Sequence, residues 1–269
     1  MSETTVAGAR FSREDVPANY ERLLVPHVFD PWARVLLDLA KVSLGESVLD
    51  VATGPGTVAR LAAERVGPAG HVTGVDISRP MLEVARAKLK GPQAASVEFI
   101  ESPAVPLPVP DGTIDLVTCQ QGLQFFPNRD AALAEMLRVL KPGGRLAVAL
   151  WAGTPPIPRQ AIRQFLAAEG FDVPIPVYPD PQELRSALLA AGFSAVTCEP
   201  ATLAIEWESA EQVFETFPTS EWASRLAKLS AERQQAALDV ARAEILALVQ
   251  DGKVRYETRA NIGLGRKPT

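Results

Sequence analysis

Apolar positions in the first 151 residues follow two alternating patterns. Short apolar runs are separated by stretches in which apolar residues recur every three or four positions. The runs predict strands, and the stretches between them predict helices. The predicted strands cover residues 48–51, 71–76, 96–101, 113–119 and 145–151. This spacing predicts an α/β fold with a doubly wound, mostly parallel sheet, whose ligand binds at the carboxyl ends of the strands.

Capping residues and helix breakers mark several boundaries. Asp30 predicts an N-cap with Pro31 at the first helical position. Ser78 predicts the start of a helix that runs through residue 90, and Asn128 the start of one that ends at residue 140. Residues 141–144, Lys-Pro-Gly-Gly, predict a turn before the fifth strand.

The pattern changes after the fifth strand. The predicted elements are helices at 157–169 and 182–191, a strand at 194–208 bent at Pro200, a helical block at about 209–250 and a last strand at 253–265. Because the helical block lies between two late strands, we expect it to cover the site and select the substrate.

A glycine loop joins the first strand to its helix, within Val48 to Arg60. Gly54 and Gly56 can take positive φ and let a ligand lie against the main chain, while the helix N-terminus that follows attracts negative charge. Asp76 ends the next strand about 20 residues later, where a carboxylate accepts hydrogen bonds from ribose hydroxyls. These residues favour a nucleotide-type cofactor. Alternatively, Asp76 only caps the turn into the following helix.

We expect one integrated domain in three parts. Residues 1–44 form an N-terminal lid arm and the first helix, residues 45–151 form the cofactor-binding Rossmann-like core, and residues 152–269 complete the sheet and carry the cap.

The composition of the chain argues against several classes of binding partner. The 269 residues, 47% of them hydrophobic, can bury a full core, and the net charge of −5 offers no general attraction to nucleic acid or anionic lipid. There is no stretch of 18 apolar residues, and the start lacks a leader pattern, so we expect a soluble cytoplasmic protein without membrane insertion. Cys119 and Cys198 are too few for a disulfide scaffold or a cysteine metal cluster, and we expect no metal site.

Four segments resemble, in the right order, the motifs of class I S-adenosylmethionine-dependent methyltransferases, in the small-molecule group of the ubiquinone and menaquinone C-methyltransferases. They are residues 48–57, Asp76, residues 102–115 and residues 141–144. The resemblance implies a Rossmann-like fold with helical lid insertions and S-adenosyl-L-methionine as cofactor, with S-adenosyl-L-homocysteine as product. The methyl group would go to an O, N or C nucleophile of a small molecule, a secondary metabolite or a quinone-like compound.

The same resemblance implies a set of cofactor-binding residues. They are Tyr20, Ala52, Thr53, Gly54, Gly56, Asp76, Ile77, Met81, Ser102, Pro103, Ala104 and Gln120.

This set departs from the family at two places. Ala52 and Thr53 stand where the family commonly has Gly and a small residue. Pro103 replaces the aspartate that holds the adenine amino group in much of the family, and proline has neither a side-chain acceptor nor an N–H. We expect adenine to be held mainly by apolar contacts, with Ser102, a loop carbonyl or a water as the substitute acceptor.

The acceptor side is less defined. The resemblance places Gln124, Phe125 and Trp151 near the substrate, and alternatively Gln124 and Phe125 only pack under the lid. His27 is a candidate general base, because an unperturbed histidine titrates near neutral pH, or else a packing residue. Asp50 should be structural, satisfying N–H groups of the glycine loop.

Two other function classes stay open. An NAD(P)-dependent oxidoreductase would explain Gly54 and Gly56, although no tyrosine is followed four residues later by lysine. A non-methylating cofactor-binding protein or a cyclase on the same fold would explain Pro103. The sequence does not identify the substrate, and a homodimer stays open.

Overall fold

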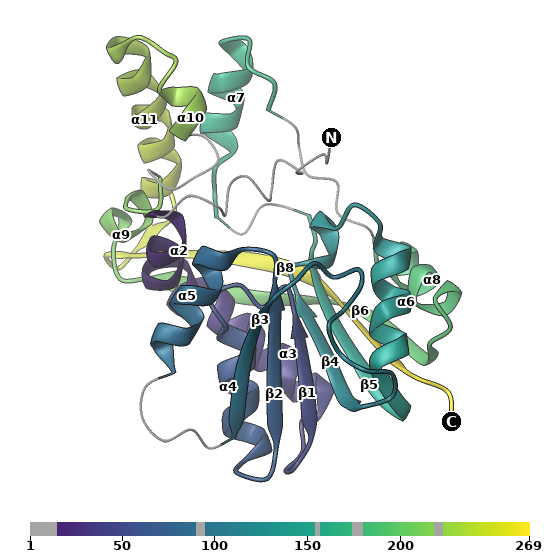
Figure 1. Ribbon diagram of the computed structural model, residues 1–269. Helices are drawn as coiled ribbons and strands as arrows, with labels where there is room; N and C mark the ends of the chain where they lie inside the picture. The colour runs from purple at the N-terminus through teal and green to yellow at the C-terminus, as the bar shows by residue number, and fades with distance from the viewer. Residues whose placement is uncertain (1–14, 90–94, 154–156, 174–179, 218–222) are drawn as a thin grey trace.

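A seven-membered path of strands forms the centre of the computed structural model, which describes residues 15–89, 95–153, 157–173, 180–217 and 223–269. The strands are β1 (Ser47–Val51), β2 (His71–Asp76), β3 (Ser96–Glu101), β4 (Ile114–Gln120), β5 (Leu140–Trp151), β6 (Ser194–Trp207), β7 (Val249–Gln250) and β8 (Lys253–Arg266). Their order in the sheet is β3-β2-β1-β4-β5-β8-β6, and the short β7 pairs with β8 (Figure 1). The first five strands are parallel, whereas β8 is antiparallel to both β5 and β6. The predicted doubly wound, mostly parallel sheet is confirmed.

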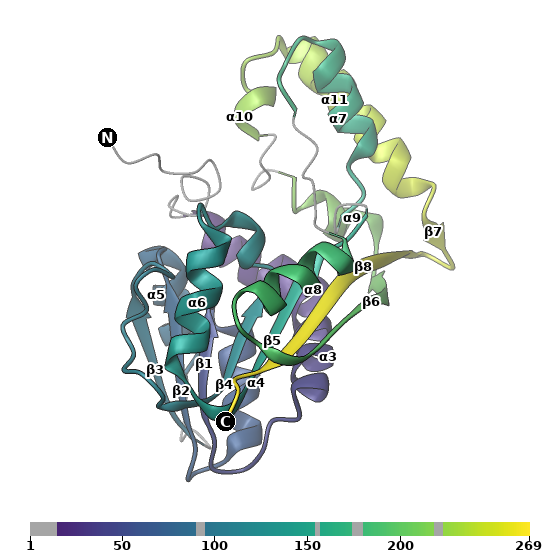
Figure 2. The same ribbon diagram turned by 90° about the vertical axis from the view of Figure 1, so that its right-hand side faces the viewer.

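Helices cover both faces of this sheet. One apolar core lies under α3 (Asp30–Ala40), α4 (Thr57–Val66) and α5 (Arg79–Lys88), and a second lies under α6 (Arg129–Val139) and α8 (Pro181–Ala190). Figure 2 shows α6 and α8 on the side of the sheet opposite α3 and α4. Large buried side chains fill these cores because each helix turns one apolar stripe inward, as with Trp32 and Leu36 on α3 and Leu133 and Met136 on α6.

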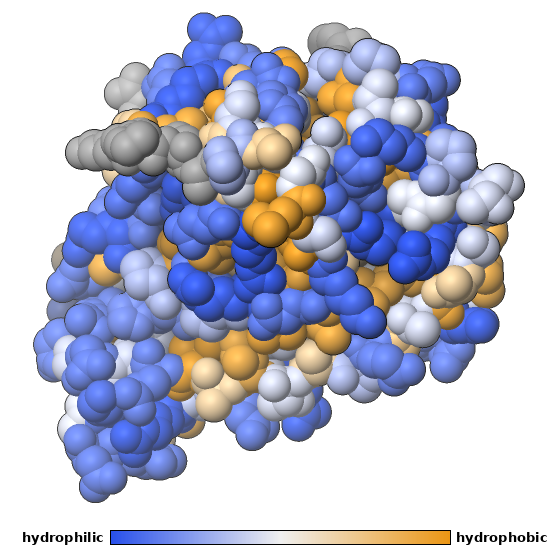
Figure 3. Space-filling view, turned by 90° about the horizontal axis from the view of Figure 1, so that it is seen from below, coloured by the Kyte–Doolittle hydropathy of each residue, from blue (hydrophilic) through white to orange (hydrophobic). Residues whose placement is uncertain are grey.

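A group of helices stands above the carboxyl ends of the strands (Figures 1 and 2). It comprises α7 (Gln160–Ala168), α9 (Ala210–Phe214), α10 (Ala223–Leu226) and α11 (Ala231–Leu246). Ile162, Leu166, Phe217 and Ala241 form a small core of their own within it. Seen from below, the opposite end of the molecule is largely hydrophilic, with several hydrophobic patches (Figure 3).

Residues 1–14 of the N-terminal arm lie outside the described residues, and from Asp15 onward the arm is helical, which overturns the predicted cap at Asp30. Residues Asp15–Asn19 (α2) continue into a π-helix, η1 (Tyr20–Phe29), and then without a break into α3. Phe29 has helical dihedral angles, and the Asp30 carboxylate accepts a hydrogen bond from Arg34 Nε at 2.7 Å. Because the helix continues upstream, α3 has no free N-terminus for Asp30 to cap.

The structure differs from two predicted interruptions of the strands, the turn at residues 141–144 and the bend at Pro200. Residues 141–144 do not form a chain-reversing turn but belong to β5, where Gly143 (φ 76°) accompanies a register shift opposite Ile114 and Leu116. β6 is an edge strand, and its pairing with β8 is regular at Pro200, which lies opposite Asn261, whereas its register shift lies between Ser194 and Thr197.

Helix boundaries differ by a few residues. α5 ends at Lys88 and residue 90 lies outside the described residues, α7 begins at Gln160, and α11 ends before β7. The start of α8 carries a capping box between Asp180 and Glu183 that places the N-cap two residues before the predicted start.

The buried carboxylate of Asp50 joins β1 to the glycine loop and to β4. Asp50 accepts hydrogen bonds from Thr53 Oγ1 at 2.6 Å and from Thr118 Oγ1 at 2.8 Å. We expected N–H groups of the glycine loop as its partners; two hydroxyls bind it, together with the backbone N–H of Ala59 in the first turn of α4. Burial raises the pKa of Asp50 to about 7, although both hydroxyl hydrogen bonds oppose the shift.

The titration of Asp50 makes stability depend on pH. Its raised pKa means that the folded chain holds the proton more tightly, so the contribution of Asp50 is greatest below about pH 4 and falls as the pH rises to about 7. We predict that the free energy of unfolding of the wild type, relative to Asp50→Asn, decreases between about pH 4.5 and pH 7.5. Urea denaturation across this range measures it. Asp239→Asn, on the exposed side of α11, is the control, and parallel pH profiles for the wild type and Asp50→Asn would contradict the prediction.

The loop after β1 depends on a glycine far along the chain. Ala52 lies in the left-handed region (φ 57°), which costs a residue with a Cβ about 1–2 kcal/mol. A Cβ on Gly122 would lie 2.5 Å from Ala52 Cβ and 3.0 Å from Cys119 Sγ. Gly122 therefore makes room for alanine at a position that favours glycine.

This contact predicts coupling between the two positions. Gly122→Ala should destabilise the fold by about 1–3 kcal/mol through overpacking. Ala52→Gly should stay within about 1 kcal/mol of the wild type, since relief of backbone strain offsets the entropy of a new glycine. In the double variant the shorter of the two clashes is gone, so a double-mutant cycle in urea should give at least about 0.5 kcal/mol of favourable coupling. Strictly additive changes would refute the contact.

Candidate functional site

The two glycines of the β1–α4 loop, Gly54 and Gly56, have different surroundings. A Cβ on Gly54 (φ 54°) would meet no atom within 4 Å, whereas one on Gly56 (φ 77°) would lie 2.8 Å from Phe99 Cζ. Gly56 is therefore required for packing against β3. Gly54 leaves open space where a ligand can lie against the main chain.

Asp76 connects this loop to the end of β2. Its Oδ2 accepts from Gly54 N and its Oδ1 from Ser78 N, both at 2.8 Å. Burial raises the pKa of Asp76, and the N–H groups of Ser78, Gly54 and Ile77 limit the rise. Asp76 thus caps the turn into α5, which was the alternative to a role in ligand binding. It also lies beside the open main chain at Gly54. A carboxylate has about four lone-pair positions, so three backbone N–H groups still leave one for a ribose hydroxyl.

The residues expected around adenine lie at the ends of β2 and β3. Ile77 is 68% exposed and Met81 is buried, while Ser102 N donates to Asp76 O at 3.0 Å. Pro103 is exposed, and Ala104 is half-buried. Ser102 Oγ donates to the Pro103 carbonyl at 3.1 Å. Its proton is engaged, so the hydroxyl can offer an amino group only an oxygen acceptor.

An ion pair that the sequence did not indicate ties the N-terminal arm to the glycine loop. Arg60 Nη1 donates to Pro55 O in that loop, and Arg60 Nη2 lies 3.0 Å from Oε1 of Glu21 on η1. Lys88 Nζ approaches the same Glu21 oxygen at 3.5 Å. Glu21 is buried, so solvent screens this contact less than a surface pair, and it links the arm to the glycine loop at Pro55.

Aromatic and amide side chains gather at the ends of β4 and β5. The Tyr20 ring stacks on Phe29 with centroids 4.6 Å apart, and Phe29 meets Trp151 edge-on at 5.9 Å. Gln120 Nε2 donates to Phe29 O at 3.0 Å, and Trp151 N donates to Gln124 Oε1 at 3.2 Å. Four predicted site residues therefore lie together around Phe29, which we had not singled out.

Phe125 and His27 are the other two residues predicted on the acceptor side. Phe125 is 44% exposed on η2 (Leu123–Phe125). His27 stacks on Trp207 with centroids 4.2 Å apart, and its Nδ1 lies 3.1 Å from Glu206 O on β6. The packing role is thus present, and the role as a base stays a prediction.

Gln121 was also missed. It is 6% exposed with a positive φ of 57°, and neither atom of its side-chain amide has a hydrogen-bond partner among the described residues. Left-handed backbone in a residue other than glycine often marks functional segments. Neither feature is visible in a sequence, because both depend on how the loop after β4 is held.

The described residues give no support for a cysteine nucleophile, a metal site or a membrane-spanning helix. Burial raises the pKa of the Cys119 thiol to about 12, so it is not a nucleophile near neutral pH. Within the described ranges, no three His, Cys, Asp or Glu side chains gather as a metal ion would require. None of the helices in the described part of the chain has the length and apolar character needed to cross a bilayer.

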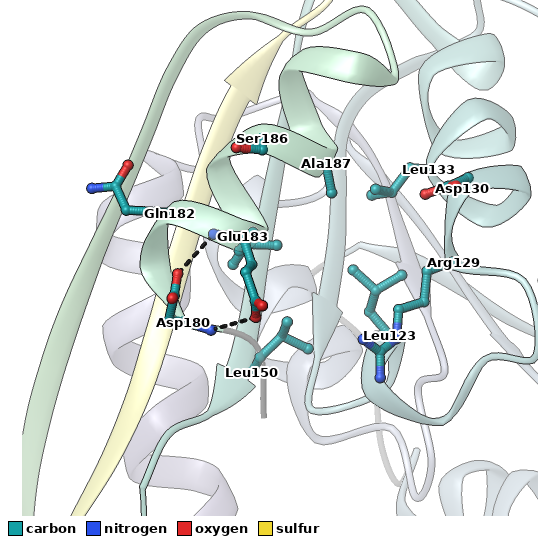
Figure 4. Close-up of a pocket in the computed structure, with 11 residues that line it drawn as sticks. Leu123, Arg129, Asp130, Leu133, Leu150, Asp180, Gln182, Glu183, Ser186 and Ala187 are labelled. Carbon is teal, nitrogen blue, oxygen red and sulfur yellow. Dashed lines mark hydrogen bonds between the residues drawn. The ribbon is translucent and has the colours of Figure 1, made fainter. Parts of the chain in front are cut away.

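A separate pocket of about 610 Å³ opens between α6 and α8 (Figure 4). Leucines from η2, α6, β5 and α8 line it together with Arg129, Asp130, Asp180 and Glu183, and Figure 4 shows the last two joined in their capping box. No predicted site residue lines this pocket, and its leucines belong to the core on the α6–α8 face. It is therefore distinct from the site at Gly54 and Asp76.

The known proteins to which the chain is similar include several named methyltransferases. The chain is 39% identical over 150 residues to the demethylmenaquinone methyltransferase of Listeria welshimeri serovar 6b, which covers 55% of this chain and 64% of that protein, just under two thirds of its length. It is 36% identical over 183 residues to the demethylmenaquinone methyltransferase of Thermus thermophilus, covering 61% and 81%. The fold matches phosphoethanolamine N-methyltransferase 2 of Haemonchus contortus with a TM-score of 0.59 and 18% identity, over 96% of this chain and 58% of that one.

A family model covers more than half of the chain. Residues 18–166 match the ubiE/COQ5 methyltransferase family. The match runs from the N-terminal arm into α7 and includes the glycine loop, Asp76 and the aromatic and amide group. The chain belongs to the ubiE/COQ5 methyltransferase family.

Proposed function

We propose that this protein transfers the methyl group of S-adenosyl-L-methionine to a quinone-like small molecule. One observation carries the proposal. Asp76 Oδ2 accepts a hydrogen bond from the N–H of Gly54, and the space beside the main chain at Gly54 is open. This combination of a carboxylate and a bare backbone suits the ribose and the amino-acid part of the cofactor. Membership of the family and the names of the two relatives support the reaction and the class of acceptor, and they weigh against a nicotinamide cofactor.

Different parts of the site would hold different parts of the cofactor. Asp76 would bind the ribose, and Ile77, Met81 and Ala104 would contact adenine beside Ser102 and Pro103. The amino-acid end would lie along Ala52, Thr53, Gly54 and Gly56, toward Gln120 and Tyr20. When bound, the cofactor supplies an already activated methyl group, so the chain itself mainly has to align the acceptor and exclude water.

The surrounding residues fit these tasks. Tyr20, Phe29 and Trp151 form a packed aromatic group, and aromatic rings near the sulfonium would attract its charge and exclude water. We further propose that the helices at about 209–250 cover the acceptor. His27 remains our candidate base. Its Nδ1 contacts a carbonyl oxygen and so carries the proton there, which leaves Nε2 to accept one.

Binding of S-adenosyl-L-homocysteine tests the cofactor assignment. Hydrogen bonds to a charged group contribute about 1.5–3 kcal/mol, so calorimetry should show Asp76→Asn binding about tenfold or more weakly than the wild type. Asp239→Asn, an equal change on α11, should bind as the wild type does.

The design separates ribose recognition from damage to the loop, because Asp76 also holds Gly54 and Ser78. A 2′,3′-dideoxy analogue of the ligand lacks the ribose hydroxyls, so Asp76→Asn should weaken its binding much less. Equal losses for both ligands would refute the ribose assignment. Absence of binding to the wild type would overturn the proposed function.

A further inference from the structure

A buried glutamate lies on the N-terminal arm, next to Tyr20. Glu21 belongs to η1 and is 7% exposed. Arg60 Nη2 lies 3.0 Å from its Oε1, and Lys88 Nζ lies 3.5 Å from the same atom. Both ion pairs are therefore made through one oxygen of the carboxylate.

The second oxygen of Glu21 has no partner among the described residues. Oε2 is buried, and it makes no hydrogen bond within the part of the chain that the structure describes. Buried polar atoms are normally paired, and an unpaired charged one is the most unfavourable because it has lost its hydration. An ionised carboxylate can only accept hydrogen bonds. Oε2 therefore indicates a ligand that supplies a donor, and a positively charged donor suits it best.

The contacts of Arg60 place this carboxylate near the glycine loop. The guanidinium group that binds Glu21 also donates, through Nη1, to the carbonyl oxygen of Pro55. Pro55 follows Gly54, where the main chain borders open space. A single guanidinium group thus separates Glu21 from the loop along which we placed the amino-acid end of the cofactor.

The backbone of the arm supports a role in binding. η1 is a π-helix over all ten of its residues, Tyr20–Phe29. π-helical turns are rare and frequently occur at functional sites. In this one, Tyr20 stacks on Phe29 in the aromatic group, while the next residue, Glu21, pairs with Arg60 beside the glycine loop. Two consecutive residues of the arm therefore serve two parts of the candidate site.

The chemistry of the cofactor identifies the missing donor. The sulfonium of S-adenosyl-L-methionine is charged but has no hydrogen to donate, and the ribose hydroxyls and the adenine amine donate but are neutral. Only the α-ammonium group is both charged and a donor.

We propose that Glu21 Oε2 binds the α-ammonium group of the cofactor. The cofactor then completes the set of partners around this carboxylate, so that one side chain joins the arm, the glycine loop and the ligand. This inference rests on the proposed function, because it takes the ligand to be S-adenosyl-L-methionine.

Three ligands that differ only at the amino-acid end test this contact by calorimetry on the full chain. S-adenosyl-L-homocysteine has the ammonium and the carboxylate, its deamino analogue has only the carboxylate, and its decarboxylated analogue has only the ammonium. A hydrogen bond between charged groups corresponds to about a ten- to hundredfold change in affinity, so the wild type should prefer S-adenosyl-L-homocysteine to the deamino analogue by that factor. Glu21→Gln should weaken both amine-bearing ligands by about tenfold and leave the deamino analogue within about twofold.

Two variants separate this contact from the support that Glu21 gives to the arm. Arg60→Gln removes the ion pair but keeps the carboxylate, so the preference over the deamino analogue should persist. Glu46→Gln is the matched control, because Glu46 pairs with Arg145 at 2.8 Å, is similarly shielded from solvent and precedes the start of β1, at the other end of the strand from the glycine loop. It should bind all three ligands as the wild type does.

The outcomes distinguish this inference from the proposed function. Equal affinity of the wild type for S-adenosyl-L-homocysteine and its deamino analogue would overturn the ammonium contact while the cofactor site stands. The same follows if Glu21→Gln weakens all three ligands equally, or if Arg60→Gln loses the preference as fully as Glu21→Gln does. If none of the three ligands binds the wild type, the proposed function falls and this inference falls with it. Thermal unfolding by circular dichroism checks that each variant is folded.

Discussion

The hydrogen bonds of Asp50 connect the elements on which the candidate site depends. A single carboxylate at the end of β1 holds Thr53, in the glycine loop, and Thr118, near the end of β4. Loops that bind ligands need rigid support, and here one buried group joins the glycine loop to strand β4. Its burial has a thermodynamic consequence, because the pKa of Asp50 rises to about 7, so the group that positions the site also makes it sensitive to pH.

Two surfaces meet above this support. On the β1–β2 side, Asp76 and the open backbone at Gly54 offer charge and main-chain contacts suited to a nucleoside. On the β4–β5 side, aromatic rings and amide side chains lie together around Phe29. The arm crosses both, since η1 carries Glu21, which pairs with Arg60, and Phe29, which anchors Gln120. This division agrees with a reaction in which the cofactor carries the reactivity and the protein mainly aligns the acceptor.

How much of this the sequence could predict depends on whether a feature is local. The strands, most helices and the doubly wound, mostly parallel class of the sheet follow from local periodicity, and the glycine loop and Asp76 follow from spacing in a known kind of turn. Asp30 was misassigned because a cap requires a free helix end, and the preceding π-helix removes it. Residues 141–144 were misassigned because a strand with a bulge can accommodate Gly143 at positive φ. Phe29, Arg60 and Gln121 were missed because their roles depend on partners brought near by the fold.

A crystal structure of the complex with S-adenosyl-L-homocysteine tests the central claim most directly. The account predicts ribose hydroxyls within hydrogen-bonding distance of Asp76, the amino-acid end along Gly54, and the sulfur atom turned toward Phe29 and Trp151. A ligand bound instead between α6 and α8, or a ribose that does not contact Asp76, would contradict it.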